Sequence, residues 1–160
     1  MSWLARHFDT AKHFGSFSKD KTKCGAIAVT QDNRLLSQGW NGFPRGIKDT
    51  VERLENRDVK LQFVAHSEQN CIYNAAYNGV SLRDSLFFVH APIHICNDCA
   101  KGIIQVGVKQ VFMCIDPTRI SDMWEEKFKI SKIMFNEANL PWKVYKEVSG
   151  FRGYELIEAS

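Results

Sequence analysis

Two short stretches of the chain carry the residue types that hold a catalytic metal ion. His66 and Glu68 are separated by one residue, and Cys96 and Cys99 are separated by two. A zinc ion bound by one His and two Cys keeps its fourth tetrahedral position open for water, which is typical of catalytic zinc sites. Such a zinc ion can lower the pKa of water to about 7. We therefore predict that His66, Cys96 and Cys99 bind zinc at a hydrolytic site.

Glu68 has the chemistry of a proton carrier beside that site. Loss of an amino group from a cytosine-type ring needs a nucleophilic water and a proton for the ring nitrogen and the departing ammonia. A carboxylate two residues from a metal ligand is well placed to move this proton. The H-x-E … C-x-x-C pattern is also the signature of zinc-dependent nucleobase deaminases. The residues therefore predict a hydrolytic deaminase in which Glu68 is catalytic and is not a ligand.

Three other interpretations use some of the same residues. Zinc could be held in a closed structural site, with Cys71 or His94 as the fourth ligand, which would leave Glu68 without a task. The two cysteines of the C-x-x-C motif could form a redox pair, with the histidine incidental. The chain could also be a non-catalytic zinc-binding or regulatory module, which would bind zinc with full protein coordination and show no turnover.

Hydrophobic periodicity predicts strands alternating with helices around these motifs. The expected helices cover residues 2–15, 66–77, 96–106 and 120–138. The expected strands cover residues 24–30, 34–39, 86–89, 109–115 and 142–148, and the first two form a hairpin. Such an alternation predicts an α/β domain with helices on both faces of a sheet. Both metal-binding motifs then lie at helix starts, and the tail from Gly150 has no assigned element.

Length and composition indicate one globular domain, residues 1–160. The formal net charge of +3 is too small to argue for nucleic acid and is compatible with a phosphorylated small molecule. Five cysteines with one close pair do not suggest a disulfide framework and favour a reducing compartment with a metal site. The sequence shows no signal peptide and no apolar run of about 20 residues. We expect a soluble, cytoplasmic protein that binds neither membranes nor nucleic acid.

Two loops are candidates for contacting a substrate. Gly39–Gly46 combines turn formers with a Trp and a Phe, which indicates a ligand-facing wall. In it, Asn41 offers a donor and an acceptor to a sugar hydroxyl. Residues 17–23 are polar and basic, and they are either a solvated connection or a phosphate-contacting loop. The charged stretch 49–62 has no Cys or His and is expected to be an exposed helix or insertion.

Several segments together carry a family resemblance that runs over residues 3–147. They are Ser18-Lys19-Asp20, Cys24-Gly25-Ala26, Gly39-Trp40-Asn41-Gly42-Phe43-Pro44-Arg45-Gly46, Ala65-His66-Ser67-Glu68, and residues 96–107. In these segments the chain resembles the deoxycytidylate (dCMP) deaminases of the cytidine deaminase-like superfamily. The zinc motif alone points only to the superfamily, and the Gly39–Gly46 stretch points to dCMP deaminases in particular.

The resemblance implies a three-layer α/β/α sandwich around a mixed sheet of about five strands. It also implies hydrolysis of dCMP to dUMP and ammonia, which feeds thymidylate synthesis, with one catalytic zinc per chain. Many members form homo-oligomers, often hexamers, and are activated by dCTP with Mg2+ and inhibited by dTTP through the region around Gly39–Gly42. By position, the family's site residues correspond to the zinc ligands His66, Cys96 and Cys99, the proton shuttle Glu68, the nucleotide-contacting Asn41, and the phosphate candidates Ser18, Lys19 and Arg45.

Three positions depart from the family pattern. Ser67 replaces the usual alanine between the His and the Glu, Ile95 replaces the usual proline before the first cysteine, and Trp40 replaces the usual tyrosine of the regulatory motif. The same chemistry on dCTP, a free nucleoside or a modified dCMP stays open as an alternative. A tRNA adenosine deaminase, whose Trp-Asn loop is similar, is a further alternative, but the low net charge argues against it.

Overall fold

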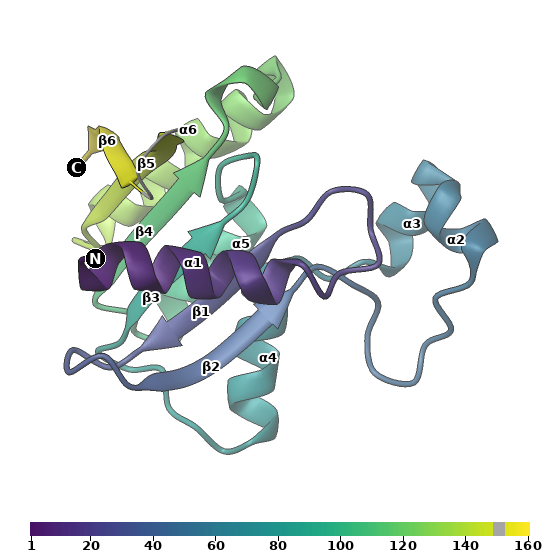
Figure 1. Cartoon of the computed structure of the whole chain (residues 1–160), viewed down its shortest axis with the longest axis horizontal. Helices are drawn as coiled ribbons and strands as arrows, with labels where there is room; N and C mark the ends of the chain where they lie inside the picture. The colour runs from purple at the N-terminus through teal and green to yellow at the C-terminus, as the bar shows by residue number, and fades with distance from the viewer. Residues whose placement is uncertain (149–152) are drawn as a thin grey trace.

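The computed structural model describes residues 1–148 and 153–160. In this part of the chain, six strands form one mixed sheet in the order β2-β1-β3-β4-β5-β6 (Figure 1). The strands are β1 (Gly25–Val29), β2 (Leu35–Trp40), β3 (Leu86–His90), β4 (Gln110–Ile115), β5 (Trp142–Val148) and β6 (Gly153–Ala159). Strands β3, β4 and β5 run parallel, whereas β2, β1 and β6 pair antiparallel with their neighbours.

Helices cover both faces of the sheet, which confirms the predicted α/β/α sandwich. Helix α1 (Trp3–Gly15) lies on one face, and α4 (Ser67–Tyr77), α5 (Asn97–Gln105) and α6 (Asp122–Glu137) lie on the other (Figure 1). Successive strand residues point to opposite faces. Ile27 and Phe88 accordingly pack with Phe8 of α1, whereas Ala28 belongs to the core on the α4 side. Burial on both faces explains why these strands are continuous apolar runs in the sequence.

The strand predicted at residues 142–148 is confirmed as β5, but it is not the last strand, because β6 follows it. Strand β6 pairs antiparallel with β5, and the sheet has six strands where about five were expected. Of the tail without an assigned element, residues 149–152 lie outside the described residues, and residues 153–159 form β6. Leu156 and Ile157 remain 49% and 41% exposed, so the strand is held by backbone pairing more than by burial. An edge strand of this kind has a weak hydrophobic pattern.

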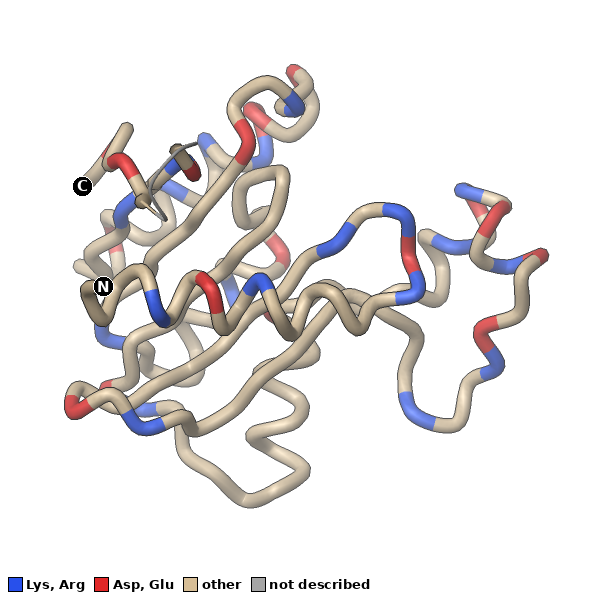
Figure 2. Tube along the Cα trace, viewed as in Figure 1, with Lys and Arg blue, Asp and Glu red and all other residues tan. Residues whose placement is uncertain are grey.

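The charged stretch upstream of His66 is the expected exposed insertion. It forms two short helices, α2 (Val51–Glu55) and α3 (Arg57–Phe63), that project from the body of the protein and bury none of their residues (Figure 1). Charged residues of both signs are frequent along it (Figure 2). Two ion pairs join it to the loop after α1, Lys60–Asp20 at 2.9 Å and Lys19–Asp49 at 2.8 Å. The insertion therefore lies next to the loop that leads into β1.

A short 3-10 helix, η1 (Pro117–Arg119), follows β4 and leads toward α6. It stands at the carboxyl end of a parallel strand, where α/β proteins commonly bind ligands. Among the described helices, none combines the length and the apolar character that crossing a lipid bilayer requires.

Candidate active site

Two helix starts bring the predicted metal ligands together. His66 is the N-cap residue of α4, Cys96 is the N-cap residue of α5, and Cys99 lies in the first turn of α5. The Nδ1 atom of His66 is 3.5 Å from Sγ of Cys96 and 3.4 Å from Sγ of Cys99. Zinc bonds of about 2.0 Å to nitrogen and 2.3 Å to sulfur at the tetrahedral angle put these atoms roughly 3.5 Å apart. The donor atoms therefore fit a zinc ion.

Close packing of α4 on β2 fixes the position of His66. A Cβ atom on Gly39 of β2 would lie 2.2 Å from the backbone nitrogen of Cys71 in α4, so glycine permits this approach. The hydroxyl of Ser37 donates to the Cys71 carbonyl at 2.7 Å, and the backbone N–H of His66 donates to the Gln69 side chain at 2.8 Å. Helix α4 therefore starts at a fixed point on the sheet, with its first residues at the metal site.

The thiols and the imidazole shift one another's pKa values in this cluster. The hydrogen bond with Cys99, together with the nearby His66 ring, lowers the pKa of the Cys96 thiol to about 4. The hydrogen bond with Cys96 in turn raises the pKa of His66 to about 9. The sulfur of Cys96 and burial raise the pKa of Cys99. At neutral pH Cys96 is therefore a thiolate, the form in which cysteine binds metals.

Glu68 lies beside this cluster without being part of it. The side chains that come together as donors are His66, Cys96 and Cys99, within 4.8 Å of one another among the described residues. Glu68 is only 6% exposed, burial raises the pKa of its carboxyl, and Ser67 donates a hydrogen bond to its Oε2 atom at 2.9 Å. A buried carboxyl with a raised pKa has the properties of a proton carrier.

The closed structural site considered from the sequence is not supported. Neither Cys71 nor His94 belongs to the donor cluster found among the described residues. Cys71 is fully buried, and burial raises the pKa of its thiol to about 12. The ring of His94 stacks on Phe128 with the ring centres 4.0 Å apart. The donor set therefore offers three protein ligands.

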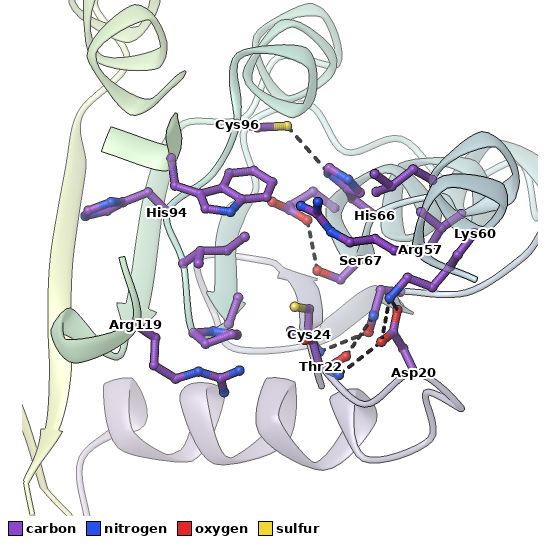
Figure 3. A pocket seen from close by; sticks show the side chains of 18 residues that line it. Asp20, Thr22, Cys24, Arg57, Lys60, His66, Ser67, His94, Cys96 and Arg119 are labelled. Carbon is purple, nitrogen blue, oxygen red and sulfur yellow. Dashed lines mark hydrogen bonds and ion pairs between the residues drawn. The ribbon is translucent and has the colours of Figure 1, made fainter. Parts of the chain in front are cut away.

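One cavity of about 280 Å³ is lined by two of the three predicted zinc ligands, His66 and Cys96 (Figure 3), and also by Glu68. His66, Glu68 and Cys96 line it on the side of the helix starts, and Trp124 and Pro92 add apolar wall. The remaining lining residues include an asparagine, three basic residues and one acid: Asn41, Arg57, Lys60, Arg119 and Asp20. This mixture of apolar wall and a few polar groups is typical of a small-molecule site.

Asn41 lies in the cavity wall, as the sequence suggested, but both ends of its amide are already used. Its Oδ1 accepts from the backbone N–H of Cys24 at 3.0 Å, and its Nδ2 donates to the carbonyl of Thr22 at 2.8 Å. Ser18 is buried next to it, and its hydroxyl donates to the Asn41 carbonyl at 2.7 Å. These two side chains hold the loop before β1 in place.

The structure does not bring Lys19 and Arg45 into the cavity. Lys19 pairs with Asp49, and Arg45 contacts Asn74 while its guanidinium lies 4.3 Å from the centre of the Tyr77 ring. Neither lines the cavity that holds His66. Their role as phosphate ligands stays a prediction from the family resemblance.

The two aromatic residues of the Gly39–Gly46 loop also lie elsewhere than expected. Trp40 packs against Phe14 and Phe17, and Phe43 packs against Phe63, so neither lines the cavity with the metal motif. Burial of a large aromatic ring is favourable, and the two rings of this loop are packed on neighbouring aromatic side chains of the protein.

Four residues that line the cavity were not identified from the sequence. They are Arg57, Lys60, Arg119 and Trp124. Two signals were available. Arg57 and Lys60 belong to a charged stretch that ends just before His66, and Arg119 follows a parallel strand at its carboxyl end. Loops at that edge of a sheet commonly form ligand sites.

The fold and the donor cluster together define a zinc-binding hydrolase-type site, and comparison with known proteins agrees. Residues 1–115 match the family described as the cytidine and deoxycytidylate deaminase zinc-binding region. The chain belongs to this family. Together, the family's zinc-binding region and the His/Cys/Cys cluster support zinc as the metal.

Similar proteins are known from several sources. An uncharacterized deaminase of Aliivibrio fischeri is 33% identical over 139 residues, which is 86% of this chain and 90% of that protein. The deoxycytidylate deaminase of Homo sapiens is 32% identical over 134 residues, covering 80% of this chain and 71% of that protein. The crystal structure of dCMP deaminase from the cyanophage S-TIM5, in complex with dCMP and dUMP, matches with a TM-score of 0.64 and 28% identity, covering 89% of this chain and 95% of that one.

Proposed function

We propose that this protein hydrolyses dCMP to dUMP and ammonia, with His66, Cys96 and Cys99 as zinc ligands and Glu68 as the proton carrier. The observation that carries the proposal is the cluster of one imidazole and two thiols, with a buried carboxyl next to it, at the wall of one cavity. The dCMP deaminases among the similar proteins support the choice of substrate. The dUMP formed would supply thymidylate synthesis.

Each side chain has a distinct task in this proposal. Bound zinc supplies Lewis-acid activation of water near neutral pH. Glu68 takes a proton from the attacking water, passes it to the ring nitrogen, and returns a proton to the amino group that leaves as ammonia. Ser67 holds one oxygen of the Glu68 carboxyl through its 2.9 Å hydrogen bond. The ring exchanges its amino group for oxygen without any change in oxidation state.

A substrate panel tests the proposal. The zinc-loaded protein is incubated with dCMP, dCTP, deoxycytidine, cytidine and a tRNA, and ammonia release is measured together with the zinc content. We expect dCMP to be the preferred substrate with one zinc per chain. Preference for dCTP or for a nucleoside would change the proposed substrate but not the proposed reaction. Bound zinc without turnover of any cytosine compound would contradict the enzyme and favour a non-catalytic zinc module.

The organisation of the protein beyond the site is a separate set of proposals. A single domain over residues 1–160 is supported by one continuous sheet in the described residues. Homo-oligomerisation, and control by dCTP or dTTP with Mg2+, rest on the family resemblance. A cytoplasmic location is supported by the five cysteines, all within the described residues, which form no disulfide.

A further inference from the structure

The insertion that holds α2 and α3 leaves the body of the protein and returns to it at one point. Gly42 and Ala65 form an isolated bridge, in which each backbone N–H donates to the other residue's carbonyl, at 3.1 and 2.9 Å. The 43–64 segment therefore runs between two adjacent anchors, and Ala65 directly precedes His66. A movement of the segment about these anchors would leave the start of α4 in place. Long loops in compact domains are often active-site lids.

One side of the 43–64 segment forms part of the cavity wall. Its contribution consists of four side chains, those of Arg57, Lys60, Leu61 and Val64. Leu61 remains 51% exposed although it lines the cavity, so it stands at the mouth. Neither α2 nor α3 buries any of its residues. Segments with few buried contacts open locally at a low free-energy cost. This part of the wall can therefore move relative to the sheet.

An ion pair joins the 43–64 segment to the loop after α1 in the cavity wall. The ammonium of Lys60 lies 2.9 Å from one carboxylate oxygen of Asp20 and 3.1 Å from the other, and the side chains are only 20% and 8% exposed. The backbone N–H of Thr22 donates to the same carboxylate at 3.1 Å, which holds Asp20 in place. Lys60 and Asp20 both line the cavity, and they meet on its side away from His94 and Arg119 (Figure 3). The ion pair therefore closes the wall between the two segments.

A second ion pair joins the same two segments but is more exposed. Lys19 and Asp49 are 2.8 Å apart, and their side chains are 67% and 41% exposed. Water and salt screen exposed charges, so pairs of this kind contribute little to stability. Of the two ion pairs, Lys60–Asp20 is therefore the one that can hold the 43–64 segment against the body of the protein.

We propose that the 43–64 segment is a lid on the cavity, and that the Lys60–Asp20 ion pair is the latch that keeps it closed. A ligand reaches Glu68, which is 6% exposed, after the latch opens, and the product leaves by the same movement. Opening of lids limits turnover in many enzymes. That the ligand is a nucleotide rests on the proposed function.

The test measures how fast dUMP binds to and leaves the zinc-loaded protein. Stopped-flow tryptophan fluorescence follows both steps, since Trp124 lines the cavity. Lys60→Gln and Asp20→Asn each break the latch, and the double variant leaves neither charge unpaired. Lys60→Arg keeps an ion pair with Asp20. The matched control is Asp49→Asn, which breaks the exposed pair between the same two segments.

Loss of the latch should speed both entry and release. An exposed ion pair is worth at most about fivefold and often nothing, and a more buried pair is screened less. We therefore expect Lys60→Gln to raise the association and the dissociation rate constants together, by about fivefold or more. The dissociation constant changes little, because the open fraction affects both rates. Asp20→Asn should act alike, and the double variant should not exceed either single variant. Lys60→Arg and Asp49→Asn should have much smaller effects.

A second measurement needs no ligand. Cys24 lines the cavity and is half-buried, whereas the other four cysteines are buried, so its alkylation by iodoacetamide reports access to the cavity. In the zinc-loaded protein, Lys60→Gln should speed this alkylation, and Lys60→Arg and Asp49→Asn should not. Asp20→Asn is unsuited to this comparison, because the charge of Asp20 itself raises the pKa of the Cys24 thiol.

Three results would overturn the lid. A raised dissociation rate constant with an unchanged association rate constant in Lys60→Gln would make Lys60 a ligand contact instead. An equal effect of Asp49→Asn would show that the buried ion pair has no special role. An unchanged alkylation rate of Cys24 in Lys60→Gln would show that the latch does not control access. If the proposed function fails, the original protein neither turns over dCMP nor binds dUMP, and the alkylation rates alone then decide whether the segment is a lid.

Discussion

Glu68 and His66 share one helix start but have different chemical surroundings. The Nδ1 atom of His66 faces two sulfur atoms, whereas the carboxyl of Glu68 accepts a hydrogen bond from Ser67 and stays outside the donor cluster. In the proposed function, His66 therefore binds the metal and Glu68, on the other side of Ser67, transfers the proton. Ser67 adds a hydrogen-bond donor that an alanine at this position would lack.

Replacement of Glu68 by Gln tests this separation. Glu68→Gln should keep one zinc per chain, because the three donors are unchanged. It should lower kcat by at least about 100-fold, because general acid–base catalysis contributes roughly 10²- to 10⁴-fold. Metal analysis and ammonia release measure the two effects. The matched control is Glu126→Gln on the exposed face of α6, which should change neither. Loss of zinc from Glu68→Gln would show that the carboxylate is a ligand.

At the scale of elements, the contact between α4 and β2 sets the position of His66 and Glu68. Gly39 of β2 lies so close to α4 that a Cβ atom would be 2.2 Å from one backbone atom of the helix and 2.5 Å from another, the carbonyl oxygen of Ser67. Backbone atoms cannot move aside as the end of a flexible side chain can. Any residue larger than glycine at position 39 must therefore push α4, and with it His66 and Glu68, away from the sheet.

Gly39→Ala should both destabilise the protein and weaken zinc binding. Overpacking of a tight contact costs about 1–3 kcal/mol, and here the displaced helix carries a metal ligand. Gly42→Ala is the matched control, because a Cβ atom there would meet only the Trp40 side chain, at 4.0 Å. Thermal unfolding and zinc content are compared for the two variants. Equal behaviour of both would contradict the view that this contact sets the position of α4.

At the scale of the whole molecule, the metal site joins two parts of the chain that are distant in sequence. His66 starts α4, which packs on β1 and β2, and Cys96 starts α5, which follows β3. Zinc bound to both would link the two helices only in the folded state. Such a ligand stabilises the native state by an amount that grows with its concentration relative to its dissociation constant.

Removal of zinc should therefore lower the melting temperature. At a zinc concentration 100 times the dissociation constant, the lost stabilisation is about 2.7 kcal/mol, or roughly 5–11 °C for a protein of this size. Calorimetric scans with and without a chelator measure the shift. Cys96→Ser provides the control, since its melting temperature should respond little to the chelator. An unchanged melting temperature after confirmed zinc removal would contradict a metal site that links the two helices.

The features that the sequence predicted best are short motifs and the strands that are buried on both faces of the sheet. The spacings of His66 to Glu68 and of Cys96 to Cys99 each fall within one helical turn, so the two motifs were recognisable before their meeting in space was known. The run around Ala26 was recognisable as a strand because helices cover both faces of the sheet. These features depend on short stretches of chain and on hydrophobic content.

The remaining features depend on distant parts of the chain. Strand β6 forms because its backbone pairs with β5, and its partly exposed Leu156 gives little hydrophobic signal. Arg57 and Arg119 are surface arginines whose nearness to Glu68 follows from the paths of an insertion and a loop. Lys19 belongs to a segment that carries the family resemblance, yet its side chain forms an ion pair with Asp49 of the insertion.

The exposed character of α3 and η1 has a consequence for how such a protein can diversify. Neither element buries any of its residues, whereas the helix starts that carry the metal motif and Glu68 are packed on the sheet. Surface substitutions away from special contacts usually change stability by less than about 0.5 kcal/mol. Mutations in α3 and η1 that leave the Lys60–Asp20 ion pair intact should therefore change the wall of the cavity at little cost to folding. The chemistry and the choice of substrate can evolve at different rates within one small chain.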